Sequence, residues 1–146
     1  MNKITPFLWF DDNAEEAMNF YVSVFKNACV INVSDQIVTF EIEGQRLVGL
    51  NGGPYFKFNE AISLYVDCNS QEEVDELWKK LTAGGGEGGQ CGWLKDKYGV
   101  SWQVVPTALF ELLNDPDPAK AQSVTKAMLQ MKKIDINALK QIREQQ

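Results

Sequence analysis

Residue types that could perform nucleophilic chemistry are few in this sequence, and they do not form a recognisable catalytic set. The 146 residues include three cysteines and no histidine. Attack by the Cys91 thiol or the Ser101 hydroxyl would need a general base within reach. The sequence places no lysine or acid at a defined spacing from either residue. We therefore assign no catalytic residue from the sequence.

The cysteines are also poorly placed for a disulfide framework or a structural zinc site. Cys29, Cys68 and Cys91 are odd in number, widely separated and without a CxxC pair. This usage is typical of free thiols in a reducing cytosol. The sequence shows neither an apolar stretch of about 20 residues nor a signal peptide pattern. We therefore expect a cytoplasmic protein that does not enter the membrane.

The run of glycines from Gly84 to Gly89 has the composition of a phosphate-binding loop. It follows a predicted helix, however, and no Lys-Ser/Thr pair opens another helix after it. A helix end followed by a turn explains these glycines better. A nucleotide-like cofactor is disfavoured for a related reason, since it would need a glycine-rich turn leading from a strand into a helix.

The composition is that of an acidic globular protein. Hydrophobic residues make up 45% of the chain, charged residues 23%, and the formal net charge is −6. Lysines and arginines are scattered among acidic residues and form no patch of the kind that binds a phosphate backbone. We expect no nucleic-acid partner.

The elements that would position any site occur twice along the chain. Leu8–Asn13 aligns with Leu64–Asn69, and after a one-residue insertion Glu15–Ala17 aligns with Glu72–Val74. In both copies a short β-branched and aromatic run leads into a helical pattern. The chain therefore contains a duplicated unit.

Both predicted helices begin with capping-box spacing and continue with one apolar face. Asn13 with Glu16, and Ser70 with Glu73, have the spacing in which the first side chain caps the helix. The apolar positions recur at helical intervals. They are Ala17, Phe20, Tyr21 and Val24 in the first helix, and Val74, Leu77, Trp78 and Leu81 in the second.

Short strands are predicted around each helix, with a hairpin turn at Asp96–Gly99. The first copy contains Ile4–Phe10, Ala28–Val33, Ile37–Ile42 and Arg46–Leu50. The second contains Ile62–Val66, Gln90–Leu94 and Val100–Val105. The sequence thus predicts an α+β fold in one domain, residues 1–146, with modules at residues 1–56 and 57–106.

The remaining residues, 107–146, have no counterpart in the first copy and form a predicted helical C-terminal extension. Asp117-Pro118 is a favoured helix start. Val124, Met128 and Met131 recur at helical spacing, and so do Ile136, Leu139 and Ile142. We expect these helices to pack on their own sheet or on a sister subunit.

Three segments carry a resemblance to a known family: Thr5–Phe10, Gly49–Pro54 and Cys91–Gln103. Together with the repeat, they resemble the vicinal oxygen chelate superfamily of glyoxalases, bleomycin-resistance proteins and extradiol dioxygenases. The similarity is greatest to its PhnB-like branch, sometimes labelled demethylubiquinone-methyltransferase-like. The methyltransferase label is disfavoured, because no glycine-rich turn leads from a predicted strand into a helix. The resemblance implies two tandem βαβββ modules that form a curved mixed sheet around a cavity. In the superfamily's metalloenzymes, a divalent ion in this cavity polarises the substrate.

The positions that hold the ion in such metalloenzymes carry other residue types in this chain. The resemblance places them at Thr5, Ala61, Gln103 and a stretch without acids near Val48–Asn51. Neutral Thr, Ala and Gln side chains do not make a charged ligand set. We therefore expect no metal ion and no other cofactor.

If the former ligand positions face the cavity, strand alternation brings an aromatic and polar set to the same face. Such a set suits a small-molecule pocket. The alternative is that these aromatic side chains fill the interior or pack in a dimer. The candidate pocket residues are Thr5, Phe7, Trp9, Asn51, Ala61, Ser63, Tyr65, Cys91, Trp93, Ser101 and Gln103.

Three functional hypotheses remain open at this point. The first is a metal-free homodimer that binds a small apolar or aromatic molecule between its modules. The second is an enzyme that uses Gln103, Ser63, Tyr65 or Cys91 without a metal ion or with a weakly held one. The third is a structural or partner-binding homodimer module that uses the helical extension.

Overall fold

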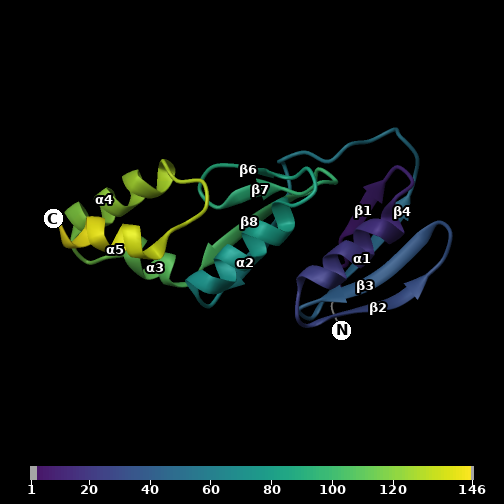
Figure 1. Cartoon of the computed structure of the whole chain (residues 1–146), viewed down its shortest axis with the longest axis horizontal. Coiled ribbons are helices and arrows are strands. Elements are labelled where there is room, and N and C mark those ends of the chain that lie inside the picture. Colours follow the sequence, from purple (N-terminus) through teal and green to yellow (C-terminus); the bar gives the residue numbers. More distant parts are fainter. Residues whose placement is uncertain (1–2, 146) are drawn as a thin grey trace. The chain divides into compact units, whose positions relative to one another are not determined.

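The computed structural model describes residues 3–145. The chain forms two compact units, divided between Phe58 and Asn59. Each contains a four-stranded mixed sheet with a helix after its first strand (Figure 1). The predicted α+β class, the duplicated module and the C-terminal helices are all confirmed.

The first unit contains one helix, α1 (Ala14–Val24), and four strands in the order β1-β4-β3-β2. β1 (Phe7–Phe10) is parallel to β4 (Gln45–Asn51), whereas β3 (Ile37–Ile42) is antiparallel to both β4 and β2 (Ala28–Val33). The bounds of β2 and β3 are those predicted. β1 begins three residues later than predicted, directly after Pro6, which has no N–H to donate to a neighbouring strand.

One face of this first sheet is buried against α1. Leu8 and Phe10 are buried on β1, as are Met18 and Tyr21 on the helix. The Tyr21 and Phe40 rings stack with their centroids 6.1 Å apart. The apolar helical face and the strand alternation therefore meet in one core, as their periodicities require.

The cap of α1 differs from the predicted capping box. Asn13 makes no side-chain cap hydrogen bond, and its φ of −117° and ψ of 30° lie outside the extended region typical of a capping residue. Instead, the Ala14 N–H donates to Asn51 Oδ1 at 2.9 Å. The prediction for Asn13 is wrong because the cap comes from a distant strand end. For the second helix the predicted cap is confirmed, since Ser70 accepts from the Glu73 N–H.

The second sheet repeats this topology with shorter strands, in the order β5-β8-β7-β6. β5 (Leu64–Cys68) leads into α2 (Gln71–Thr82), followed by β6 (Glu87–Gly88), β7 (Trp93–Lys95) and β8 (Ser101–Pro106). The predicted strand Gln90–Leu94 is wrong at its start. Cys91 and Gly92 have φ values of 56° and 85°, so the chain is still turning there.

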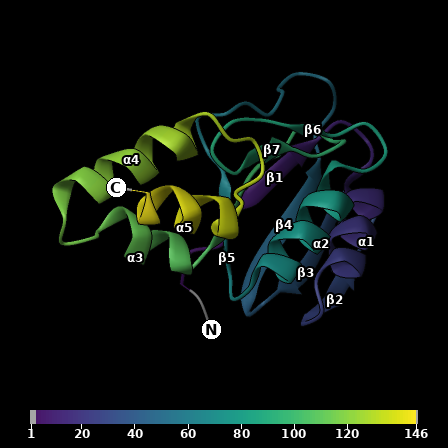
Figure 2. The same ribbon diagram turned by 60° about the vertical axis from the view of Figure 1, so that its left-hand side comes forward.

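Three helices follow β8 and pack within the second unit: α3 (Ala108–Leu113), α4 (Pro118–Leu129) and α5 (Ile136–Glu144). They lie together at one end of this unit (Figure 2). Asp117 caps α4 as predicted, accepting from the Ala119 N–H at 2.9 Å. Met131 lies beyond the end of α4 and packs against the apolar cluster of the three helices. The three helices thus pack mainly on one another within the second unit, together with Val105 of β8.

Within residues 3–145, no helix combines the length and the apolar character of a transmembrane span.

Candidate functional site

A cavity of about 480 Å³ lies in the second unit. Its walls come from the turn between β6 and β7, from the side chains of β7, and from Ser101 at the start of β8. A volume of this size is within the range of small-molecule sites. The cavity is therefore large enough for a molecule containing an aromatic ring.

Ser101 is a cavity-lining residue whose hydroxyl group is buried without a hydrogen-bond partner among the described residues. The residue is 2% exposed. Leaving a buried hydroxyl unpaired costs about 1–3 kcal/mol, so such groups are uncommon unless something else satisfies them. Because this oxygen has almost no accessible surface, a ligand in the cavity can supply the missing partner once the atoms that cover Ser101 shift aside.

The strand that carries Ser101 is held in place by a buried carboxylate. Asp96 Oδ1 accepts from the Val100 N–H at 3.0 Å, and Asp96 Oδ2 accepts from the Trp102 Nε1–H at 2.9 Å. The Gly99 N–H also donates to the Asp96 carbonyl at 2.9 Å. The predicted hairpin turn is confirmed by these bonds, which flank Ser101 on both sides.

The opposite wall is a tight turn in an uncommon backbone conformation. The Gly89 N–H donates to the Trp93 carbonyl at 2.7 Å, and between these residues Cys91 has a φ of 56°. A non-glycine residue rarely adopts this left-handed conformation. The N–H groups of Cys91 and Gly92 donate to the carbonyls of Met131 and Lys132, each at 2.8 Å. The conformation of the turn is therefore fixed by the connection between α4 and α5, residues 130–135.

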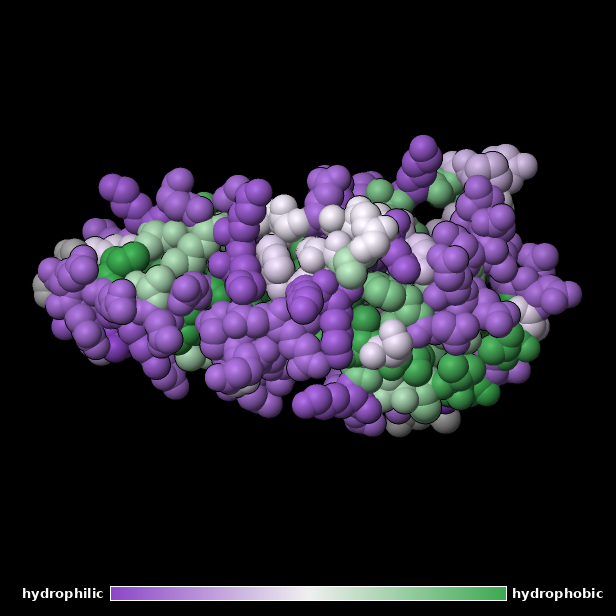
Figure 3. Space-filling model, in the orientation of Figure 1, coloured by the Kyte–Doolittle hydropathy of each residue, from purple (hydrophilic) through white to green (hydrophobic). Residues whose placement is uncertain are grey.

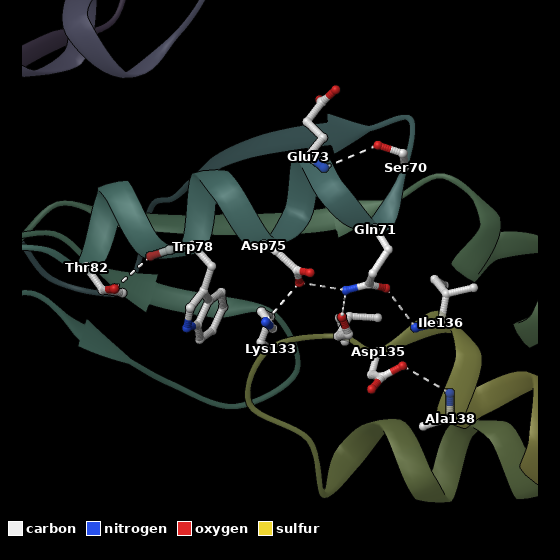
Figure 4. A network of polar contacts seen from close by, with 11 residues as sticks. Ser70, Gln71, Glu73, Asp75, Trp78, Thr82, Lys133, Asp135, Ile136 and Ala138 are labelled. Atoms are coloured by element: carbon white, nitrogen blue, oxygen red, sulfur yellow. Dashed lines mark hydrogen bonds and ion pairs between the residues drawn. The ribbon is translucent and has the colours of Figure 1, made fainter.

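A side-chain network anchors this connection to α2 (Figure 4). Gln71 Nε2 donates to the Ile134 carbonyl, and Gln71 Oε1 accepts from the Ile136 N–H, both at 2.9 Å. Asp75 on the same helix forms an ion pair with Lys133 at 2.8 Å, and this pair helps to lower the pKa of Asp75. The helical extension, the first turn of α2 and the cavity wall thus form one connected structure.

The rim of the cavity carries charged side chains. Lys95 forms an ion pair with Glu60, and its hydrogen bond lowers the pKa of Glu60 while its own pKa is raised. Glu87 faces Lys95 from the neighbouring strand. Because both partners of the ion pair are largely exposed, we expect its strength to depend on salt.

The structure brings three of the predicted pocket residues to this cavity: Cys91, Trp93 and Ser101. Gln103 and Tyr65 lie opposite each other on the same sheet, and Gln103 Nε2 donates to Ser63 Oγ at 3.0 Å. Burial raises the pKa of Tyr65, and nearby Asp67 adds to this effect.

The other predicted positions lie elsewhere. Ala61 is exposed before β5, and Thr5, Phe7, Trp9 and Asn51 belong to the first unit.

In the first unit, two of these residues have partners of their own. Trp9 Nε1 donates to the Gly53 carbonyl at 2.9 Å, and the Trp9 ring meets Phe56 edge to face with centroids 4.9 Å apart. Asn51 caps α1, as described above, and also donates to the Asp35 carbonyl. Phe7, by contrast, is 63% exposed.

Sequence reasoning missed several lining residues, among them Glu60, Glu87 and Lys95. Alternation could have identified Lys95, which shares a face with Trp93, had the predicted strand extended beyond Leu94. Glu60 belongs to a loop, and no sequence signal connects it to Lys95.

Among residues 3–145, no group of three or more His, Cys, Asp or Glu side chains is arranged to hold a metal ion. The positions that the resemblance points to offer no better set. Ala61 has no donor atom, Thr5 and Gln103 are neutral, and the Gln103 amide is bonded to Ser63. The residues present do not fit a divalent metal centre.

Comparison with known proteins places the fold in a defined group. Residues 2–105 match the model of the family described as 3-demethylubiquinone-9 3-methyltransferase. The PhnB protein from Bacillus cereus, which carries the same methyltransferase description, is 35% identical with a TM-score of 0.68. The match covers 73% of this chain and all of that one.

More distant structures share the fold alone. A glyoxalase-related enzyme from Fulvimarina pelagi is 16% identical over 75% of this chain and 91% of its own, with a TM-score of 0.56. The fosfomycin resistance protein FosX from Listeria monocytogenes, in complex with Mn(II) and sulfate, is 20% identical over 69% and 86%, with a TM-score of 0.54. No curated protein matches the chain.

Proposed function

This chain belongs to the 3-demethylubiquinone-9 3-methyltransferase family, and we propose that it binds a small aromatic molecule in the cavity of its second unit. The observation that carries the proposal is the buried hydroxyl of Ser101, which has no hydrogen-bond partner among residues 3–145. A bound molecule with a hydrogen-bonding group would replace the interaction that Ser101 lacks in the free protein. We therefore expect a ligand with one polar group to bind more tightly than a purely apolar ligand of the same size.

The lining indicates the class of ligand. Trp93 provides an aromatic wall, which favours a flat ring packed against it. Lys95 already has Glu60 as its ion-pair partner, so an uncharged ligand need not break this pair. A neutral aromatic molecule with one hydroxyl or carbonyl group fits these walls best.

The family description names methyl transfer, but the turns of this chain do not fit a nucleotide-like methyl donor. Such a donor is usually bound at a glycine-rich turn from a strand into a helix. Here β1 leads to α1 through Asp11-Asp12-Asn13, and β5 leads to α2 through Asn69-Ser70, neither of which contains glycine. We derive no methyl-transfer step for this chain.

Calorimetric titration with para-hydroxybenzylacetone tests the proposal. This molecule is a phenol ring with a short saturated ketone chain. At about −0.3 kcal/mol for each of its roughly 12 non-hydrogen atoms, we expect a dissociation constant of about 2 millimolar. Absence of binding by this compound and by a panel of neutral aromatic alcohols and ketones would contradict the proposal.

A second part of the proposal is self-association through the first unit. Val30, Ile31 and Val33 on β2 are exposed, and so is Ile37 on β3. Hydrophobic side chains gather over these strands (Figure 3). β2 lies at one edge of its sheet, and two copies of one edge strand can pair antiparallel about a two-fold axis.

We therefore propose a homodimer formed by a second copy of this chain on β2. Sedimentation should give twice the monomer mass, and Ile31→Lys should shift the protein to the monomer. A monomeric wild-type protein would refute this part. An unaltered dimer in the variant would show that β2 is not the interface.

A further inference from the structure

Cys91 lines the same cavity as Ser101, and its backbone is held in place by hydrogen bonds to a distant segment of the chain. Its left-handed φ of 56° is unfavourable for a residue with a side chain, and such strain is often found at functional sites. Two backbone hydrogen bonds, donated by Cys91 and Gly92 to the carbonyls of residues 131 and 132, maintain the turn. These residues lie outside the region that matches the family model, which ends at residue 105.

The strand register gives the relative positions of the two groups. Ser101 is opposite Lys95, and Gln103 is opposite Trp93. Along β7, Trp93 therefore lies between the level of Ser101 and the turn that carries Cys91. With a rise of about 3.3 Å per residue, shortened by the turn, the hydroxyl and the thiol are separated by roughly 10 Å.

We propose that Cys91 captures an elongated aromatic enone bound in this cavity by forming a thioether with it. The inference rests on the proposed function, because the ligand must first occupy the cavity. A hydroxyl group at one end of the ligand would pair with Ser101, the ring would lie on Trp93, and the unsaturated carbonyl would reach Cys91. A para-hydroxybenzylideneacetone molecule has these groups in this order and about the required length.

The step is a conjugate addition of the Cys91 thiolate, and because no base among residues 3–145 is placed beside Cys91, water takes the proton from the thiol and later returns one. The sulfur of Cys91 forms a bond to the β-carbon, and the carbon–carbon double bond becomes single. Its electron pair moves toward the carbonyl oxygen and returns when the α-carbon takes up the proton that the thiol has lost. Binding supplies the rate advantage, since it converts a bimolecular reaction into one between neighbouring groups.

The other two cysteines provide controls within the same molecule. Cys29 is exposed on β2, outside the cavity. Cys68 is fully buried, and burial raises the pKa of its thiol to about 12, which keeps it protonated and unreactive. Because Cys29 lies on the strand of the proposed dimer, its accessibility is calibrated with iodoacetamide, and only a preference for Cys91 beyond that calibration reports recognition by the cavity.

Peptide mapping by mass spectrometry after timed exposure to para-hydroxybenzylideneacetone tests the inference. We expect Cys91 to react at least about ten-fold faster than Cys29, at a rate that saturates with concentration. An excess of saturated para-hydroxybenzylacetone should protect Cys91, and Ser101→Ala should slow its reaction. With iodoacetamide, which is too small to need the cavity, the ratio of the Cys91 rate to the Cys29 rate should be at least about ten-fold lower than with the enone. Cys29→Ser should leave the reaction at Cys91 unchanged.

Equal rates at Cys91 and Cys29, or a rate that rises linearly with concentration and is not protected, would overturn the inference. If the saturated compound binds but Cys91 does not react, the covalent step is wrong and the proposed binding function stands. If neither compound binds, both are wrong. The mapping uses the wild-type protein, so it does not depend on the folding of any variant.

Discussion

Replacement of Ser101 by alanine should change folding stability and ligand affinity in opposite directions. In most proteins, removing a buried hydroxyl breaks a hydrogen bond and costs about 0.5–1.5 kcal/mol. Ser101 Oγ has no partner among residues 3–145, so Ser101→Ala breaks no such bond and removes the cost of burying a polar atom. We expect the free energy of unfolding to stay unchanged or to rise by up to about 1 kcal/mol.

The same substitution removes the hydrogen bond that the ligand would form. Loss of about 0.5–1.5 kcal/mol corresponds to an affinity roughly two to thirteen times weaker for para-hydroxybenzylacetone. Urea unfolding followed by tryptophan fluorescence gives the first quantity, and calorimetric titration gives the second. Ser23→Ala, at an exposed serine of α1, is the matched control and should leave the affinity unchanged.

Two results would refute this reasoning. A loss of more than about 1 kcal/mol of stability in Ser101→Ala would mean that the hydroxyl is bonded within the protein. An unchanged affinity would mean that the ligand does not contact Ser101.

Three other perturbations test the structure around the cavity. Gln71→Ala removes the side-chain hydrogen bonds to residues 134 and 136, so it should lower the free energy of unfolding by about 2 kcal/mol. Amide hydrogen exchange at Cys91, which is bonded to the same connection, should become faster, whereas Gln122→Ala at an exposed helix position should change neither quantity. Asp96→Asn cannot accept the indole N–H with its amide nitrogen and should cost about 1–3 kcal/mol in urea unfolding, with exposed Asp67→Asn as its control. Burial raises the pKa of the Cys68 thiol from 9.0 to about 12, so the unfolded chain loses the thiol proton at a lower pH than the folded chain does. The stability that the protonated thiol contributes is therefore complete below pH 9 and is lost at up to about 1.4 kcal/mol per pH unit toward pH 12. Urea unfolding across this range should show the slope in the wild-type protein and not in Cys68→Ala.

Much of the fold could be predicted because local patterns determine it. The bounds of β2 and β3 follow from apolar alternation between two turns, and the caps of α2 and α4 follow from Ser70 and from Asp117 with Pro118. The buried helix faces were predictable for the same reason, since the apolar residues recur with the helical period of 3.6 residues.

The rest depends on contacts between segments far apart in the chain. Asn51 caps α1 from 37 residues away. A prediction of the capping residue from neighbouring residues alone therefore chooses Asn13 instead. The turn at Cys91 is held by backbone carbonyls of Met131 and Lys132, and a backbone carbonyl has no side-chain signature.

The candidate site shows the same division. Strand alternation predicts Ser101 on the pocket face, and Ser101 lines the cavity together with Trp93. That the Ser101 hydroxyl has no partner within the described residues is a property of the packed structure and has no counterpart in the sequence.

The most direct test of the central claim is an amide NMR titration of the whole chain with para-hydroxybenzylacetone. Our account predicts saturable shift changes concentrated at the cavity residues, chiefly Gly88–Trp93 and Ser101, and much smaller changes in the first unit. Shift changes that are absent, that do not saturate, or that centre on residues outside the cavity would contradict it.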